Sequence, residues 1–168
     1  ELEGIHHRGD WDLKRHNLTY KDKMTNEEFT PWVIETSGGV DRTILFLLLE
    51  AYTKDGERTI LKLHPSLAPF TAAVFPLVSN KPDLVKKAET VYKLLQQTFR
   101  VAWDDRGNIG KRYFSQDEAG TPFCITIDFT TLDDETVTIR NRDTAKQERV
   151  AIGKILEYIE EKMKEDSL

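Results

Sequence analysis

Apolar residues recur along the second half of the chain with two different spacings. One set repeats every three to four positions, which places its members on one face of a helix: Leu84, Ala88, Val91, Leu95 and Phe99. A second set of this kind lies near the end of the chain: Ile152, Ile155, Leu156, Ile159 and Met163. Between these sets the apolar positions alternate or form short runs, as in strands. Because strands alternate with helices, the pattern predicts a layered α/β domain.

The strand-like runs in this half occur at residues 71–78, 101–103, 123–129 and 136–140, with Asp128 breaking the third. A short helix is expected over residues 109–118. Residues 144–150 allow two interpretations. Thr144 and Gln147 have the spacing of a capping box that starts the last helix, but residues 147–150 could equally form a short strand.

The first half predicts fewer elements. Residues 32–35 have the pattern of a strand, Gly38 and Gly39 turn the chain, and residues 40–52 form a helix. This helix is apolar on nearly every side after Thr43, which predicts that it is buried. Residues 1–5 could form a strand, and residues 17–29 have the composition of a polar loop or an insertion.

A domain boundary is expected between residues 53 and 69. Residues 53–58 are polar and contain a glycine, and the segment 64–69 carries two prolines, which disfavour a helix. We therefore divide the chain into a first domain at 1–53, a linker at 54–69 and a second domain at 70–168.

Composition narrows the class of protein. The chain has 168 residues, of which 39% are hydrophobic, so it can bury a core. The longest apolar run, residues 44–49, is far shorter than the roughly 20 residues of a membrane span. With 24 Lys and Arg against 29 Asp and Glu the net charge is −5. Any contact with a nucleic acid must therefore come from a local basic surface.

The chain has one cysteine, Cys124, which excludes an internal disulfide framework and a multi-cysteine zinc site. A reducing cytosol fits this composition best. Cys124 lies in the middle of an expected strand, so we interpret it as a buried structural thiol and not as a nucleophile. The first residues include no initiator Met and no signal segment, which predicts that the sequence starts inside a longer protein.

The segment 35–42 joins a strand, a Gly-Gly turn and a helix start. The helix N-terminus offers free N–H groups that suit a phosphate, and Arg42 in the first turn could clamp phosphate oxygens. The alternative is a tight strand-to-helix joint with a solvated Arg. The segment matches neither a Walker loop nor a GxGxxG fingerprint.

A second cluster combines acids and histidines near the start of the chain: Glu1, Glu3, His6, His7, Arg8, Asp10 and Asp12. Such side chains could hold a hard metal ion or steer a triphosphate through Mg²⁺. They could equally form a solvated loop.

A third segment, residues 106–114, carries three cations and no acid, with Tyr113 and Phe114 beside the cations. Cations for phosphate with aromatic rings for stacking are typical of single-stranded RNA recognition. Further polar side chains that could contact RNA are Gln116, Asp117, Glu118, Arg140 and Arg142. The alternative is a charged loop with a buried aromatic residue.

These segments together resemble the C-terminal part of glycyl-tRNA synthetase, of the homodimeric type within class II. Residues 1–5 and 8–13 are similar to a segment that lines the active site, and residues 32–42 resemble motif 3 of class II enzymes. Residues 64–69 resemble the link into the anticodon-binding domain. The signatures of that domain correspond to residues 109–113, 116–118, 120–124 and 140–144. The resemblance covers nearly the whole chain.

The resemblance implies an α/β fold in two parts. Residues 70–168 would be an α/β/α anticodon-binding domain with a mixed five-stranded sheet. Residues 1–53 would be part of a class II catalytic domain, which has an antiparallel sheet. The implied chemistry is ATP-dependent activation of glycine, then transfer to the 3′ end of tRNA(Gly). The expected location is the cytoplasm, without a membrane anchor, and the parent enzyme would be a homodimer.

Site residues follow from the same resemblance. The residues implied for ATP are Glu1, Leu2, Gly39, Val40, Asp41 and Arg42, with Arg42 catalytic and Glu1 touching Mg²⁺ through ATP. Those implied for glycine are Glu35, Thr36, Ser37, Gly38 and Gly39. Those implied for the anticodon or the rest of tRNA are Lys111, Arg112, Tyr113, Gln116, Asp117, Glu118, Arg140 and Arg142. The family usually has Pro where Thr36 stands, which puts the fine shape of the pocket in question.

Class II motifs 1 and 2 are not found in this sequence. We therefore expect that the chain alone does not form an adenylate and needs the missing N-terminal catalytic part. Two other readings stay open: a non-catalytic nucleic-acid-binding module of the same fold, like a polymerase accessory subunit, and an enzyme fragment that works as a second polypeptide.

Overall fold

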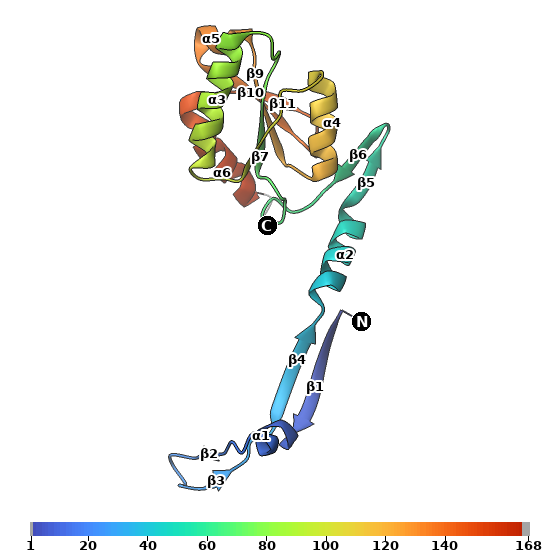
Figure 1. Cartoon of the computed structure of the whole chain (residues 1–168), viewed down its shortest axis with the longest axis vertical. Helices are drawn as coiled ribbons and strands as arrows, with labels where there is room; N and C mark the ends of the chain where they lie inside the picture. Colours follow the sequence, from blue (N-terminus) through green and yellow to red (C-terminus); the bar gives the residue numbers. More distant parts are fainter. Residues whose placement is uncertain (1, 166–168) are drawn as a thin grey trace. The chain divides into compact units, whose positions relative to one another are not determined.

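The computed structural model of the chain describes residues 2–165 and divides into two compact units, residues 1–47 and 48–168 (Figure 1). Among the described residues, no helix has both the length and the apolar character needed to cross a membrane. Each unit is described separately below.

The first unit is built on a two-stranded antiparallel ladder. Strand β1 (Glu3–Gly9) pairs with β4 (Val33–Gly38), so that Gly4 lies opposite Ser37 and His6 opposite Glu35. A strand is therefore present in the segment where one was considered at residues 1–5, but it begins at Glu3 and extends to Gly9. Between β1 and β4 lie the short helix α1 (Trp11–Arg15) and a minimal hairpin of β2 (Tyr20–Lys21) and β3 (Glu28–Phe29). Only the hairpin lies within residues 17–29, the segment expected to be a polar loop or an insertion.

Helix α2 (Val40–Ala51) forms where the apolar pattern predicts it, but the expectation that it is buried is wrong for this chain. Its apolar side chains are largely exposed: Val40 by 72%, Leu49 by 64% and Leu45 by 55%. Ala51 is its one buried residue, at the end where its carbonyl oxygen accepts a hydrogen bond from the N–H of Lys62 (2.7 Å). Among the described residues, nothing covers most of the apolar side chains of α2.

The second unit is an α/β domain around a five-stranded mixed sheet, as expected. Its strands lie in the order β11 (Gln147–Ala151), β10 (Thr136–Asn141), β9 (Phe123–Ile127), β7 (Ala72–Pro76) and β8 (Val101–Trp103). Strands β8, β7 and β9 are parallel to one another, and β10 runs antiparallel to both of its neighbours.

Helices cover both faces of this sheet (Figure 1). Helix α3 (Pro82–Gln96) buries Leu84, Ala88, Val91 and Leu95 in the main core, and α6 (Ile155–Glu165) adds Ile155 and Ile159. On the opposite face α4 (Ile109–Ala119) packs through Ile109 and Tyr113 against a smaller core of Ala73, Phe75 and Cys124. The predicted helical faces of α3 and α6 are confirmed.

The two interpretations of residues 144–150 are resolved in favour of a strand. Strand β11 pairs antiparallel with β10, placing Val150 opposite Val137, and a 3₁₀ turn (Ile152–Lys154) then leads into α6. The break at Asp128 is also real. Its carboxylate accepts a hydrogen bond from the N–H of Thr131 (3.0 Å) and so caps α5 (Phe129–Asp134). This helix has six residues, too few for a helical period to show in the sequence.

The segment expected to be a linker contains part of a hairpin. Strand β5 (Tyr52–Asp55) pairs antiparallel with β6 (Arg58–Leu61), and β6 packs against α4. Ile60 is fully buried in this contact. Gly120, which ends α4 in the left-handed conformation, approaches β6 so closely that an added Cβ would lie 3.1 Å from the carbonyl oxygen of Leu61.

We predict that Gly120→Ala lowers the free energy of unfolding by about 2 kcal/mol, because the new methyl group meets the Leu61 carbonyl at a φ of +79° that disfavours L-residues. Gly56→Ala is the matched control, since its φ is +61° but no atom lies within 4 Å of the added Cβ. Gly56→Ala should lower the free energy of unfolding by about 1 kcal/mol, because only the unfavourable positive φ contributes there. Urea denaturation of both variants measures the difference, and equal losses would show that β6 yields without cost.

Candidate functional sites

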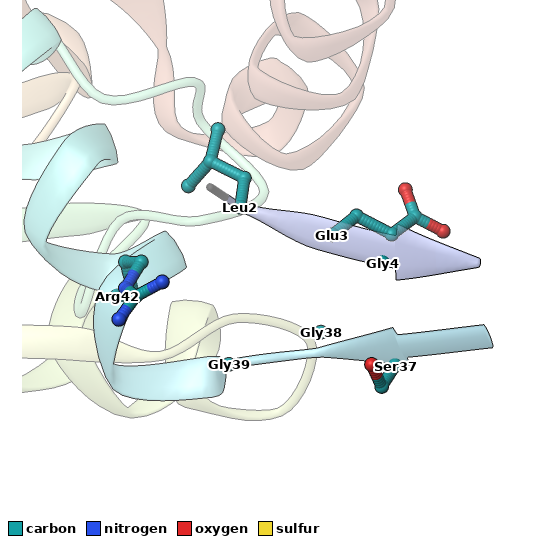
Figure 2. Close-up of a pocket in the computed structure, with 7 residues that line it drawn as sticks. All are labelled: Leu2, Glu3, Gly4, Ser37, Gly38, Gly39 and Arg42. Atoms are coloured by element: carbon teal, nitrogen blue, oxygen red, sulfur yellow. The ribbon is translucent and has the colours of Figure 1, made fainter. Parts of the chain in front are cut away.

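The first unit contains a small pocket where the ladder meets the start of α2. It has a volume of about 300 Å³, at the lower end of the range for small-ligand sites. Figure 2 shows its lining residues on β1 and just before it, on β4 and the glycine that follows it, and on the first turn of α2. The lining residues are Leu2, Glu3, Gly4, Ser37, Gly38, Gly39 and Arg42. Five of the residues implied for ATP or glycine therefore lie together here.

The side chains of β4 point alternately to the two faces of the ladder, and this places the remaining glycine candidates on different faces. Directly paired residues share a face and neighbours in a strand alternate, so Glu35 and Ser37 lie on one face with His6. Thr36 lies on the opposite face, beside Ile5. The carboxylate of Glu35 also forms an ion pair with Arg8 at 3.3 Å.

The start of α2 gives this pocket its electrostatic character. The first turn of a helix presents N–H groups with a partial positive charge. Arg42 adds a guanidinium in that turn and lines the pocket. The turn is held by Thr43, whose hydroxyl and N–H both donate to the Gly39 carbonyl oxygen at 2.9 Å. Val40 and Asp41 do not line the pocket and are exposed. The arrangement suits an anion such as a phosphate group.

The cluster of acids and histidines is largely used in local ion pairs. Arg8 binds Asp12 through two nitrogens, which raises the pKa of Arg8 and lowers the pKa of Asp12. Asp10 pairs with Lys14 at 2.7 Å. Within residues 2–165, no group of three or more His, Cys, Asp or Glu side chains could hold a metal ion. Glu1, the residue implied for Mg²⁺, lies outside the described residues.

The second unit brings together most of the residues expected to contact RNA, but it buries them. Lys111 and Glu118 are exposed, and Tyr113 is half-buried. The other five are buried: Arg112, Gln116, Asp117, Arg140 and Arg142. Burial of so many charged groups requires partners inside the protein.

Asp117 provides the centre of this network. Its carboxylate is fully buried and accepts two hydrogen bonds from Arg140, at 2.8 and 3.0 Å, and one from Arg58 at 3.1 Å. Arg58 also donates to the carbonyl oxygen of Arg142 at 2.6 Å. Burial opposes the charge of Arg140, but its bonds to Asp117 outweigh that effect and raise its pKa. Arg140 therefore keeps its charge, and the hydrogen bonds to Asp117 tie β6, α4 and β10 together.

The neighbouring polar residues have equally specific partners. Arg142 donates to the carbonyl oxygen of Gly120 at 2.7 Å and to the carboxylate of Asp143. Gln116 accepts a hydrogen bond from Thr121 at 2.6 Å. The ring of Tyr113 lies under the guanidinium of Arg140, 5.0 Å from its centre. These contacts hold α4 and the residues that follow it against β10.

Arg112 is 2% exposed and donates to three backbone carbonyl oxygens, those of Pro76, Arg106 and Gly107, at 2.6 to 3.0 Å. Among the described residues it forms no ion pair. It therefore fixes the end of β7 to the loop before α4.

Cys124 is buried and unpaired, as expected of a structural thiol. Burial raises its pKa to about 12, so the thiol stays protonated and unreactive near neutral pH.

Arg58 is the member of the site that sequence reasoning missed. It is separated from Asp117 by 59 residues and lies in a segment expected to be a linker. Nothing in the local pattern distinguishes it from a solvated cation, so only the docking of the hairpin reveals its partner.

Comparisons with known proteins cover both units. The family model of the anticodon binding domain matches residues 71–162, which is more than half of the chain. The chain is 51% identical over 171 aligned residues to the glycine–tRNA ligase of Clostridium beijerinckii, and 47% identical over 178 to that of Thermobifida fusca. It is 45% identical over 172 aligned residues to the glycine–tRNA ligase of Borreliella afzelii.

These alignments include 95% to 97% of this chain but only 36% to 38% of each relative. The chain thus spans less than two fifths of the length of the curated relatives it matches.

We predict that Asp117→Asn lowers the free energy of unfolding by about 3 kcal/mol, because it leaves two guanidinium groups without their buried counter-charge. Asp143→Asn is the matched control. It also removes a carboxylate that binds an Arg through two nitrogens, but its side chain is 36% exposed. The control should lose at most about 1 kcal/mol. Urea denaturation at pH 7 gives both values, and losses of equal size would remove Asp117 from the centre of the network.

Proposed function

The chain belongs to the anticodon binding domain family, and from this premise we propose that it is the C-terminal part of a glycine–tRNA ligase. The reaction would have two steps. A carboxylate oxygen of glycine attacks the α-phosphorus of ATP, and pyrophosphate leaves. A hydroxyl of the 3′-terminal ribose of tRNA(Gly) then attacks the carbonyl carbon of glycyl-adenylate, and AMP leaves.

One observation carries this proposal: the similarity to glycine–tRNA ligases extends over 95% to 97% of the chain. The family model of the anticodon binding domain alone covers residues 71–162. The similarity to the ligases therefore also includes most of the first unit, with its pocket. Because these relatives are glycine–tRNA ligases, the alternative of a non-catalytic nucleic-acid-binding module of the same fold is not favoured.

The pocket of the first unit would hold part of the adenylate. We propose that Arg42 neutralises phosphate charge that develops as pyrophosphate leaves, with the N-terminus of α2 and Gly39 close to the same phosphates. Glu35 and Ser37 share a polar face of the ladder, where a carboxylate and a hydroxyl suit the ammonium group of glycine. Thr36 lies on the other face, which supports a role in shaping the strand and not in contacting glycine.

ATP would enter as a substrate, and Mg²⁺ would supply charge neutralisation on its phosphates. Leu2 lines the pocket and would lie against the nucleotide. Glu1 remains the residue proposed for contact with Mg²⁺. We also propose that the whole enzyme is a homodimer in the cytoplasm.

The second unit would bind the anticodon stem-loop. Of the eight candidates, Lys111 and Glu118 are exposed and can reach RNA directly. The buried residues Arg112, Gln116, Asp117, Arg140 and Arg142 would act by holding the binding surface in shape. Lys111 is suited to a phosphate contact, which positions the RNA without reading its sequence.

We predict that residues 1–168 bind tRNA(Gly) more tightly than a tRNA(Gly) whose anticodon cytosines are replaced, by about tenfold or more, because wrong bases leave polar groups unpaired. Fluorescence anisotropy at 50 and 200 mM salt measures both affinities. Phosphate contacts weaken as salt rises, but a preference for bases should survive. Equal binding of the two tRNAs at the higher salt would overturn the proposal that this chain reads the anticodon.

We also predict that residues 1–168 alone give no glycine-dependent exchange of pyrophosphate into ATP. The apolar sides of α2 and the Ile5 and Ile34 side chains of the ladder are exposed in this chain, so the catalytic domain lacks covering elements. The full-length ligase of Clostridium beijerinckii, assayed in parallel, is the positive control. Exchange above background by the chain alone would show that the first unit is a sufficient catalytic centre.

A further inference from the structure

A small hollow lies in the second unit between helix α6 and the hairpin of β10 and β11. Its volume is about 210 Å³, and its lining comes from β10, the turn after it, β11 and α6. The hollow lies on the face of the sheet that α6 covers, opposite α4 (Figure 1). None of its lining residues is among those implied for ATP, glycine or tRNA.

The hairpin supplies one wall of this hollow. Ile139 of β10 lies directly opposite Glu148 of β11. One step along the strand pair in each direction that keeps the same face, the N–H of Asn141 donates to the carbonyl oxygen of Lys146 at 3.0 Å. Opposed residues and alternate residues of one strand share a face, so these four side chains lie on one side of the hairpin. Ile139 is buried in the main core, whereas the three polar side chains are half-buried or exposed.

Helix α6 supplies the other wall through Tyr158, Lys162 and Glu165. Their spacing of four and three positions places them on one side of the helix. The Tyr158 hydroxyl donates to Oε2 of Glu148 at 3.0 Å, which joins the two walls. Lys162 pairs with Glu165 of its own helix at 2.8 Å. A contact between helix and sheet that is apolar in the core is therefore polar on both walls at this end.

Two donors in the hairpin wall have no partner in the described part of the chain. Oδ1 of Asn141 accepts hydrogen bonds from the N–H groups of Asp143 and Thr144, both at 3.0 Å. Because an N–H group can only donate, the atom that faces these groups is the oxygen, and the NH₂ of Asn141 is left over. Among residues 2–165, this NH₂ forms no hydrogen bond and Lys146 forms no ion pair. An amide NH₂ beside an ammonium group suits a carboxylate.

The charges of the lining balance one another. Lys146 and Lys162 contribute two positive charges, and Glu148 and Glu165 contribute two negative ones. A ligand with only anionic groups would be repelled by the two carboxylates, and one with only cationic groups by the two lysines. A ligand with one group of each sign avoids both penalties. The hollow is smaller than the roughly 300 Å³ at which pockets for drug-sized ligands begin, so such a ligand has about the size of an amino acid.

We propose that this hollow is a binding site for a free α-amino acid. The carboxylate of the ligand lies at Lys146 and at the NH₂ of Asn141. Its ammonium group lies at Glu148, whose Oε1 accepts no hydrogen bond from residues 2–165. Lys146 and Glu148 are two positions apart on one face, so one small molecule can reach both. The inference goes beyond the proposed function and does not depend on it, because it involves neither the pocket of the first unit nor contacts with RNA.

The first experiment compares three related compounds as ligands of the full chain. L-valine carries both charges, N-acetyl-L-valine lacks the ammonium group, and L-valinamide lacks the carboxylate. Nuclear magnetic resonance of ¹⁵N-labelled chain follows the side-chain NH₂ of Asn141 and the backbone amides of the lining during each titration. We expect L-valine to bind about tenfold more tightly than either analogue, since each analogue loses one charged hydrogen-bonding group. Valine is used because it is not the substrate of the proposed ligase.

Two variants then test the two ends of the site. Lys146→Gln should weaken binding of L-valine about tenfold and leave L-valinamide unchanged, because that compound lacks the group that Lys146 binds. Glu148→Gln keeps an acceptor for the Tyr158 hydroxyl, and it should weaken L-valine but not N-acetyl-L-valine. Lys164→Gln is the matched control, since Lys164 is exposed on α6 outside the lining and its replacement removes the same charge as Lys146→Gln. Circular dichroism establishes that all three variants fold.

The outcomes decide the proposal without involving the proposed function. Shifts confined to the lining, a preference for L-valine and its loss in Lys146→Gln but not in Lys164→Gln support the site. It is overturned if about 50 mM L-valine, far above a millimolar Kd, shifts none of these signals. Equal responses to the three compounds, or equal losses in Lys146→Gln and Lys164→Gln, also overturn it. None of these results bears on binding of tRNA or on formation of the adenylate, which their own experiments test.

Discussion

The buried carboxylate of Asp117 is the interaction on which the second unit depends. It is fully buried and joins Arg140 of β10 and Arg58 of β6 to its own helix, α4. A buried ion pair is stable only when its remaining donors and acceptors are satisfied. Here Arg58 also binds the carbonyl oxygen of Arg142, and Arg140 lies over the ring of Tyr113. Three elements distant in sequence are thereby fixed at one point.

This network changes how the basic residues of the second unit are understood. Their number and their neighbouring aromatic rings indicate RNA binding, yet most of them are committed to partners within the domain. Arg112 binds backbone carbonyls, and Arg142 binds Gly120 and Asp143. They define the surface near α4 without being exposed on it. Of the residues implied for RNA contact, Lys111 and Glu118 remain exposed, Lys111 in the first turn of α4.

In the first unit, by contrast, both the polar candidate residues and many apolar side chains are exposed. One face of the ladder carries Glu35 and Ser37, and the other carries Ile5 and Ile34, which are 73% and 70% exposed. Helix α2 adds further exposed apolar side chains next to Arg42. Large exposed apolar patches mark surfaces that meet another protein segment. The chain spans less than two fifths of the length of the curated relatives it matches.

The sequence by itself determined the elements with a clear period. The helical faces of α3 and α6, the strand-turn-helix around Arg42 and the mixed α/β class follow from spacing, because burial of a repeating face is a local property of the chain. Segments too short for a period, such as α5, were beyond this reasoning. The tertiary structure alone decided which charges are buried. The partners of Arg58, Arg112 and Arg140 depend on contacts between distant parts of the chain. Arg58, for example, donates to the carbonyl oxygen of Arg142, which is 84 positions away. No local pattern records such contacts, because the free energy of a charge is set by its surroundings and not by its neighbours in sequence.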